Sequence, residues 1–221
     1  MIKKQFRKES DSMGQMSVPK DALYGAQTAR AVENFPISKL RFNRSFIEAL
    51  GVIKFSAAKA NLSLKLISGD VGNSIMKAAN EVISGKHDSE FVVDIFQTGS
   101  GTSSNMNANE VISTLANKFI KGKTKVHPND HVNLCQSSND VIPTAMHISV
   151  YSLILNSLVP NLKILEKELS LKARKFDKIF KIGRTHLQDA TPITLGQEFG
   201  GYASMVSKSI EFIKQASSNL S

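Results

Sequence analysis

Three short segments of this 221-residue chain concentrate hydroxyl, amide and imidazole groups, the side chains that hydrogen-bond small anions. Each segment abuts a predicted helix, whose N-terminal N–H groups and dipole favour negative charge. The segments are Gly99-Ser100-Gly101-Thr102-Ser103-Ser104-Asn105, then His127-Pro128-Asn129-Asp130 with Gln136-Ser137-Ser138-Asn139-Asp140, then Gly183-Arg184-Thr185-His186-Leu187-Gln188-Asp189. Glycine lets the backbone approach a ligand closely, and histidine titrates near neutral pH. The composition therefore indicates an anion site with acid–base chemistry.

A simpler interpretation of each segment is helix capping. Ser, Thr, Asn and Asp often precede helices only because their oxygens accept from free N–H groups. Taken singly, each segment fits this interpretation better than a ligand site. Three of them in one chain favour a shared site.

A metal site is not predicted. His127 and His131 stand four residues apart, a spacing that can bind a metal ion on one helix face. Pro128 and the Asn129-Asp130 turn are expected to break such a helix. Cys135 is the only cysteine, so this chain alone can form neither an internal disulfide nor a multi-cysteine metal site.

Other function classes are also poorly supported. The stretch Gly99-Ser100-Gly101 lacks the Gly-x-Ser-x-Gly elbow of serine hydrolases, and His87 and His147 are expected to be structural. The net charge of +9 could suit nucleic acid, but no recognised nucleic-acid motif accompanies it. The lysines are instead scattered where a solvated helix face would place them, at Lys54, Lys59, Lys65, Lys77, Lys163, Lys167 and Lys172.

The location expected for the protein is cytoplasmic. No stretch approaches the ~20 consecutive apolar residues that span a bilayer, and the basic start of the chain has no apolar segment behind it. With 41% hydrophobic residues, the chain has ample material for a core.

Long helices must position these segments. Residues 45–67 predict one amphipathic helix, with its apolar stripe at Phe46, Leu50, Ile53, Ala57, Ala60, Leu64 and Ile67. A second helix is predicted from an Asn73 N-cap to Gly85, and a third follows Ser104 and ends before Gly122. Periodicity leaves 91–96 ambiguous.

A further run of helices is predicted in the second half of the chain. Residues 123–139 predict a loop and a domain boundary, giving an N-terminal domain over 1–134 and an incomplete helical bundle over 135–221. A helix begins near Val141, with Pro143 in its first turn, and it is kinked or restarted at Pro160. Residues 183–196 predict a polar loop, and a last helix runs to the end of the chain without a cap. The fold class is mainly α, with long helices packed in a bundle, and the chain is expected to be cut within a helix.

The polar motifs together resemble the fumarase/aspartase superfamily, and within it class II fumarases. The resemblance rests on 99–102 with Asn105-Met106-Asn107 and Asn109-Glu110-Val111, on the His127 and Gln136 segments, on 183–192, and on Asp11-Ser12-Met13-Gly14 with Tyr24-Gly25-Ala26-Gln27-Thr28. It covers nearly the whole chain in the family's order. Aspartate ammonia-lyases, the alternative within the superfamily, carry Gln where His186 stands.

This resemblance implies reversible hydration of fumarate to (S)-malate in the citric acid cycle, without a metal or an organic cofactor. His186 would be the catalytic acid–base residue. Ser100, Gly101, Thr102, Ser137, Ser138, Asn139 and Thr185 would bind the dicarboxylate substrate. The three segments would then converge on a cavity for a four-carbon diacid, with His186 on its wall.

The resemblance also implies a second, non-catalytic dicarboxylate site at His127, Pro128, Asn129 and Asp130. Thr124 stands where relatives commonly have arginine, which weakens the expected affinity for an anion. Lys123 or Lys125 could supply a point charge there, but not the bidentate fork of arginine.

Family members form homotetramers around their central helices, and each active site combines loops from three subunits. The family's downstream Gly-Ser-Ser loop, with its following lysine and asparagine, is missing from this sequence. We therefore expect a fragment that needs a C-terminal half for activity. The alternative is an inactive remnant or a helix-mediated interaction protein, since bare apolar helix faces favour association with a partner.

Overall fold

The computed structural model describes residues 5–121 and 124–220 and confirms a mainly helical fold. The chain divides into two compact units, Met1–Ser149 and Val150–Ser221. The division falls inside helix α5 (Ser138–Leu153). The domain boundary proposed at residue 134 stays a prediction.

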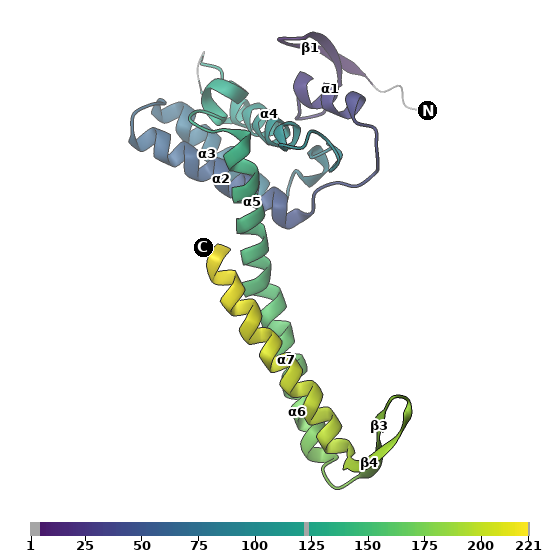
Figure 1. The fold of residues 1–221 in the computed structure, drawn as a ribbon. Coiled ribbons are helices and arrows are strands. Elements are labelled where there is room, and N and C mark those ends of the chain that lie inside the picture. The colour runs from purple at the N-terminus through teal and green to yellow at the C-terminus, as the bar shows by residue number, and fades with distance from the viewer. Residues whose placement is uncertain (1–4, 122–123, 221) are drawn as a thin grey trace. The chain divides into compact units, whose positions relative to one another are not determined.

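The first unit begins with a hairpin that the sequence analysis missed. Strand β1 (Phe6–Asp11) pairs antiparallel with β2 (Gly14–Pro19), and Gly14 turns the chain with a φ of 118°. Helix α1 (Ala26–Asn34) lies beside this hairpin (Figure 1). Asp11-Ser12-Met13-Gly14, quoted above as a motif, therefore forms a hairpin turn.

The core of the first unit lies between three helices, α2 (Arg44–Ser63), α3 (Gly69–Ile83) and α4 (Thr102–Phe119) (Figure 1). The fully buried residues include Leu50, Ile75, Val82 and Ile112. The predicted Asn73 cap is wrong, because Ser68 caps α3 and accepts from the Val71 N–H. The C-terminal prediction is confirmed: Gly85 follows the α3 cap with a φ of 80°.

The predicted stripe on α2 is correct at its first two positions, and Ile67, which lies beyond the helix, is also buried. Phe46 and Leu50 are buried, but Leu64 lies beyond the helix end and is 67% exposed. The buried face in the second half consists of Lys54, Ala58 and Asn61. This face packs against a polar loop, and Asn61 donates to the Leu134 carbonyl of that loop. Because the buried face is partly polar, apolar periodicity could not identify it.

Between α4 and α5 the chain is less irregular than predicted. Pro128–Val132 forms a π-helical turn inside the predicted 123–139 loop, and a short 3-10 helix at Asp88–Glu90 lies earlier, between α3 and α4. The break expected at Pro128 is confirmed for His127, which precedes the turn in an extended conformation, while Pro128 itself occupies the first turn, where no N–H is needed. Gly122 and Lys123 lie outside the described residues.

The second unit is a helical pair with a hairpin. A π segment, η3 (Ile154–Leu158), leads into α6 (Val159–Lys175), which packs along α7 (Leu195–Ser217), and a 3-10 turn follows at Ser218–Leu220 (Figure 1). The restart at Pro160 is thus confirmed. The predicted 183–196 loop is wrong: β3 (Phe180–Thr185) and β4 (Gln188–Thr194) form an antiparallel hairpin.

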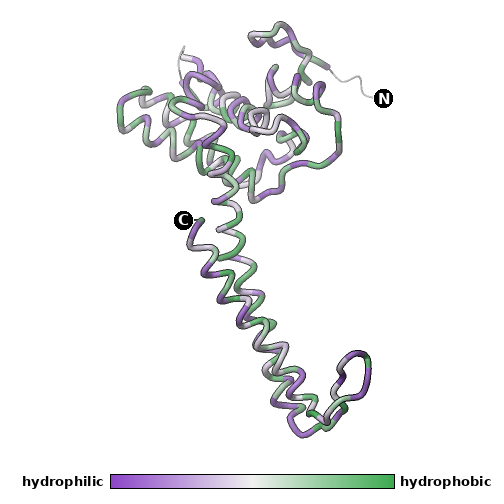
Figure 2. The backbone as a smooth tube through the Cα atoms, viewed as in Figure 1, coloured by the Kyte–Doolittle hydropathy of each residue, from purple (hydrophilic) through white to green (hydrophobic). Residues whose placement is uncertain are grey.

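Large apolar side chains remain exposed on the helices of the second unit. The tube in Figure 2 mixes hydrophobic and hydrophilic residues along α6 and α7. The exposed residues include Leu155, Leu158, Ile164, Leu165, Leu171, Met205 and Phe212. The described part of the chain therefore does not complete the predicted helical bundle. By length and composition alone, Ser138–Lys175 is also the one described helix that could cross a membrane, a test that core helices of soluble assemblies pass too.

Candidate anion-binding site

The first polar segment is built on the N-terminus of α4. Gly101 precedes the helix with a φ of 71°, and its carbonyl accepts from the Ser104 and Asn105 N–H groups. The Ser100 and Thr102 hydroxyl oxygens lie 2.9 Å apart, and both residues are exposed. Two hydroxyls therefore stand at the positive end of an 18-residue helix.

The second segment meets the first through a side-chain hydrogen bond. Ser138 begins α5, and its Oγ accepts from Asn105 Nδ2 of α4 at 2.9 Å. Because Ser138 Oγ accepts this bond, its own proton remains available to a ligand. Ser137 and Asn139 flank it as exposed residues, and the Asn139 N–H donates to Ser137 Oγ at 3.4 Å. The structure thus brings the Ser100 and Ser138 segments together.

Beneath these segments lies a lysine that the sequence analysis placed on a solvated face. Lys54 is fully buried, and its Nζ donates to Asn133 Oδ1 at 3.0 Å and to Gln136 Oε1 at 2.9 Å. Burial lowers the pKa of Lys54 to about 7. No local pattern marks Lys54, since the loop that covers it comes from a distant part of the sequence.

The third segment forms the turn of the β3–β4 hairpin in the second unit. His186 and Leu187 occupy the two turn positions with φ values of 48° and 61°, a conformation that normally favours Gly or Asn. Thr185 and His186 are exposed, and Leu187 is 92% exposed. Two such residues in this conformation store strain, which often marks functional sites. The catalytic role of His186 stays a prediction.

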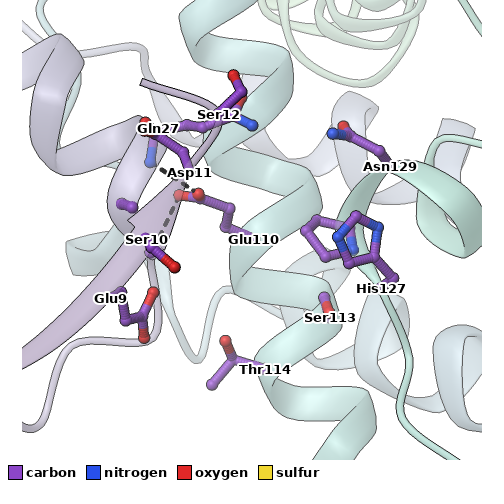
Figure 3. A pocket seen from close by; sticks show the side chains of 13 residues that line it. Glu9, Ser10, Asp11, Ser12, Gln27, Glu110, Ser113, Thr114, His127 and Asn129 are labelled. Atoms are coloured by element: carbon purple, nitrogen blue, oxygen red, sulfur yellow. Dashed lines mark hydrogen bonds between the residues drawn. The ribbon is translucent and has the colours of Figure 1, made fainter. Parts of the chain in front are cut away.

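The predicted second dicarboxylate site borders a cavity of about 600 Å³ in the first unit. His127, Pro128 and Asn129 line it, and Figure 3 shows His127 and Asn129 across from carboxylate-bearing residues. Asp130 lies outside the lining, and its backbone N–H donates to His127 Nδ1 at 3.2 Å. Lys123 lies outside the described residues, and the exposed Thr124 and Lys125 are not part of the lining.

The opposite wall of this cavity carries Glu9, Asp11 and Glu110. Arg30 binds Asp11 through two hydrogen bonds and holds the pKa of that carboxyl below its ordinary value. Glu110 accepts from the N–H groups of Gly25, Gln27 and Thr28, at the start of α1. Glu9 pairs with Arg7 at 2.6 Å, so all three carboxylates have partners, and no Lys or Arg is among the residues that line the cavity.

Metal ligands do not gather in the described residues: no group of three or more His, Cys, Asp or Glu side chains could hold an ion there. His131 was considered above as a metal ligand, but its Nδ1 accepts from the His127 backbone N–H at 2.8 Å. That bond ties the π-helical turn together.

Comparison with known proteins identifies close relatives. A class II fumarate hydratase of Halobacterium salinarum is 56% identical over 98% of this chain and 47% of its own length. An aspartate ammonia-lyase of a Bacillus species is 50% identical over 97% of the chain and 46% of its own length. The crystal structure of a recombinant class II fumarase from Schistosoma mansoni matches with a TM-score of 0.93 at 41% identity, over 98% of this chain and 46% of that one.

The chain therefore spans about half the length of the curated relatives it matches. The family model described as Lyase matches residues 14–221, which include both hydrogen-bonded segments and the His186 hairpin. On this evidence the chain belongs to the lyase family.

Proposed function

We propose that this chain is part of a fumarate hydratase that adds water reversibly to fumarate to give (S)-malate. The observation that carries the proposal is the Asn105–Ser138 hydrogen bond, which joins two anion-binding segments in a chain 56% identical to a class II fumarate hydratase. Exposed hydroxyls at two adjacent helix N-termini suit a substrate with two carboxylates. The reaction would need no metal or organic cofactor and would belong to the citric acid cycle in the cytoplasm.

The proposed chemistry follows from the charge that develops. Loss of the C3 proton of malate places extra negative charge on the neighbouring carboxylate, and preorganised donors stabilise such charge. Ser100, Gly101, Thr102, Ser137, Ser138, Asn139 and Thr185 are the proposed substrate-binding residues. His186 would deprotonate the incoming water, or protonate the departing hydroxyl in the reverse direction.

The proposed active form is a larger assembly. The exposed apolar faces of the second unit suit burial against further helices, as in a homotetramer completed by a C-terminal half. We propose the domain division at residues 134 and 135 for this assembly. His127 to Asp130 would form a second dicarboxylate site only if a cation from outside the described cavity lining joined it.

Turnover tests the proposal directly. The purified chain is assayed for loss of fumarate absorbance, alone and mixed with the C-terminal half of the Corynebacterium glutamicum class II fumarate hydratase, a 49% identical relative. We expect activity only in the mixture. If no mixture is active although both halves are folded and associated, the chain is an inactive remnant or an interaction protein.

His186→Asn tests the acid–base role within the same mixture. We expect turnover to fall at least ~100-fold, the low end for general acid–base groups. His147→Asn is the matched control, because His147 is an exposed histidine with no proposed role in the reaction, and it should retain activity. Unchanged turnover in His186→Asn would remove this residue from the mechanism.

Aspartate ammonia-lyase activity is the second candidate, because one relative with that name is 50% identical. Both reactions remove a proton next to a carboxylate and differ in the leaving group, hydroxyl or ammonia. Supplying malate and aspartate separately to the mixture and measuring the fumarate that forms distinguishes them. We expect fumarate from malate only, while fumarate from aspartate would favour the second candidate.

A further inference from the structure

Lys54 is a fully buried cation in the anion-binding region, and its burial has no explanation in capping or core packing. It lies on α2 with no exposed surface, although an ammonium group loses strong hydration there. Within the described parts of the chain it forms no ion pair, and both acceptors of its Nζ are neutral amide oxygens. A buried cation without an anionic partner is costly unless something compensates it.

The partners of Lys54 lead directly to Ser138. Asn133 Oδ1, which accepts from Lys54, also accepts from Asn105 Nδ2 at 3.1 Å. The same Asn105 Nδ2 donates to Ser138 Oγ at 2.9 Å. Three hydrogen bonds therefore connect the ammonium group to the hydroxyl at the start of α5.

Gln136, the second partner of Lys54, fixes the loop in front of Ser138. The Gln136 side-chain Nε2 donates to the Val132 and Leu134 carbonyls, while the Gln136 backbone carbonyl accepts from Asn133 Nδ2. Asn105 Oδ1 is buried without a partner in the described structure, so the Asn105 amide is held through its donor side. The loop thus has one defined arrangement, with Lys54 at its base.

We infer that Lys54 is a positioning residue for the dicarboxylate, which holds Ser138 through Asn133 and Asn105 and, in its protonated form, places a positive charge without an anionic partner behind the anion-binding loop. The inference rests on the proposed function. A bound dianion would supply the negative charge that the buried ammonium lacks. Because the interior screens charge less than water does, this attraction acts even without direct contact.

The test measures binding of succinate, a dicarboxylate that cannot be hydrated, by calorimetry, together with kcat and KM for fumarate in the mixture described above. Lys54→Met removes charge and donors, and Lys54→Arg keeps both. Lys59→Met is the matched control, because Lys59 is an exposed lysine on the same helix. If Lys54→Met fails to fold, Lys54→Gln replaces it, since Gln keeps one hydrogen-bond donor without the charge.

We expect Lys54→Met to weaken succinate binding and raise the KM at least about tenfold, the scale of one partly screened charge. Lys54→Arg should recover most of the affinity, and Lys59→Met should match the wild type. Equal affinity in Lys54→Met overturns the inference. Equal losses in Lys54→Met and Lys54→Arg, each in step with a lower melting temperature, also overturn it, because that result means a purely structural lysine.

The two proposals fail in different ways. If the wild type binds succinate but does not hydrate fumarate, the proposed function is wrong and Lys54 is judged from succinate binding alone. If the wild type hydrates fumarate and Lys54→Met does so with unchanged KM, only the Lys54 inference is wrong. If the wild type neither binds succinate nor turns over fumarate, both are overturned.

Discussion

At the scale of single residues, Gly101 is constrained twice. Its φ of 71° lies in the left-handed region, which costs other residues about 1–2 kcal/mol. A Cβ at this position would also stand 2.7 Å from Cγ1 of Ile142, a buried residue of α5. The glycine therefore allows α4 and α5 to approach each other where Ser100, Thr102 and Ser138 gather.

Gly101→Ala should lower the free energy of unfolding by about 2–4 kcal/mol, because backbone strain and overpacking add. Urea denaturation of the chain measures the change. Gly99→Ala is the control, since the same loop offers open space at Gly99 and a side chain there meets nothing within 4 Å. Equal stability of the two variants would contradict this account of Gly101.

Lys54 should make stability depend on pH. Burial lowers its pKa from 10.5 to about 7, so between about pH 7 and 10 the unfolded chain binds more protons than the folded chain. Stability should therefore rise with pH across this window, by up to about 1.4 kcal/mol per pH unit. Below pH 7 both states are charged and the penalty of burial is fully present.

Urea denaturation at several pH values between 7 and 9 measures this slope. Lys54→Met should flatten it, whereas Lys59→Met, which changes an exposed lysine on the same helix, should leave it intact. A slope that survives in Lys54→Met would assign the pH dependence to another group.

Sequence reasoning at this scale works where local chemistry decides. Hydroxyls and glycine beside expected helix starts marked Ser100, Gly101 and Ser138, and the structure places Gly101 before α4 and Ser138 at the start of α5. Lys54 was missed because lysines usually face solvent, and its burial depends on a loop about 80 positions away, at Asn133 and Gln136. No pattern near Lys54 reports such a contact.

At the scale of elements, helix α1 begins without a cap of its own. Its N-cap residue is Gly25, which offers no side-chain oxygen. Glu110 of α4 replaces that cap from a distance, accepting from the N–H groups of Gly25, Gln27 and Thr28 at 2.8 to 3.1 Å. A carboxylate at a helix N-terminus also complements the helix dipole.

Glu110→Gln should destabilise the first unit by about 1–2 kcal/mol. The substitution removes the negative charge, and the new side-chain NH₂ group faces backbone N–H groups, which cannot accept a hydrogen bond from it. Urea denaturation, with far-UV circular dichroism as the signal, measures the loss. Glu48→Gln is the control, because Glu48 is half exposed and lies 3.9 Å from Arg44, an arrangement of little energetic value. Comparable losses in the two variants would refute the special role of Glu110.

Elements were predicted well where periodicity ran long and poorly where turns were unusual. The helices around Phe46, Ile112 and Leu162 had clear apolar spacing and are present. The β3–β4 hairpin was missed because His186 and Leu187 occupy turn positions where Asn or Gly is the usual signal.

At the scale of the whole molecule, the second unit lacks a complete core. Leu158, Leu165 and Phe212 are 43%, 47% and 67% exposed, and further large apolar residues share the same helices. Apolar surface on this scale is uncommon on a monomer and usually marks an interface. The apolar spacing predicts helices packed in a bundle, and the described residues of the second unit supply only part of such a bundle.

We expect the purified chain to self-associate through this unit, with a mass in sedimentation velocity that grows with concentration. Leu165→Glu should shift the chain toward monomer, because burying an unpaired carboxylate in an apolar interface is unfavourable. Lys167→Glu is the control. It also introduces a glutamate on α6, but it replaces an exposed lysine and should leave association unchanged. Identical masses for the two variants would place the interface elsewhere. If the chain instead co-sediments with lipid vesicles and does not self-associate, the apolar Ser138–Lys175 helix meets a membrane rather than other helices.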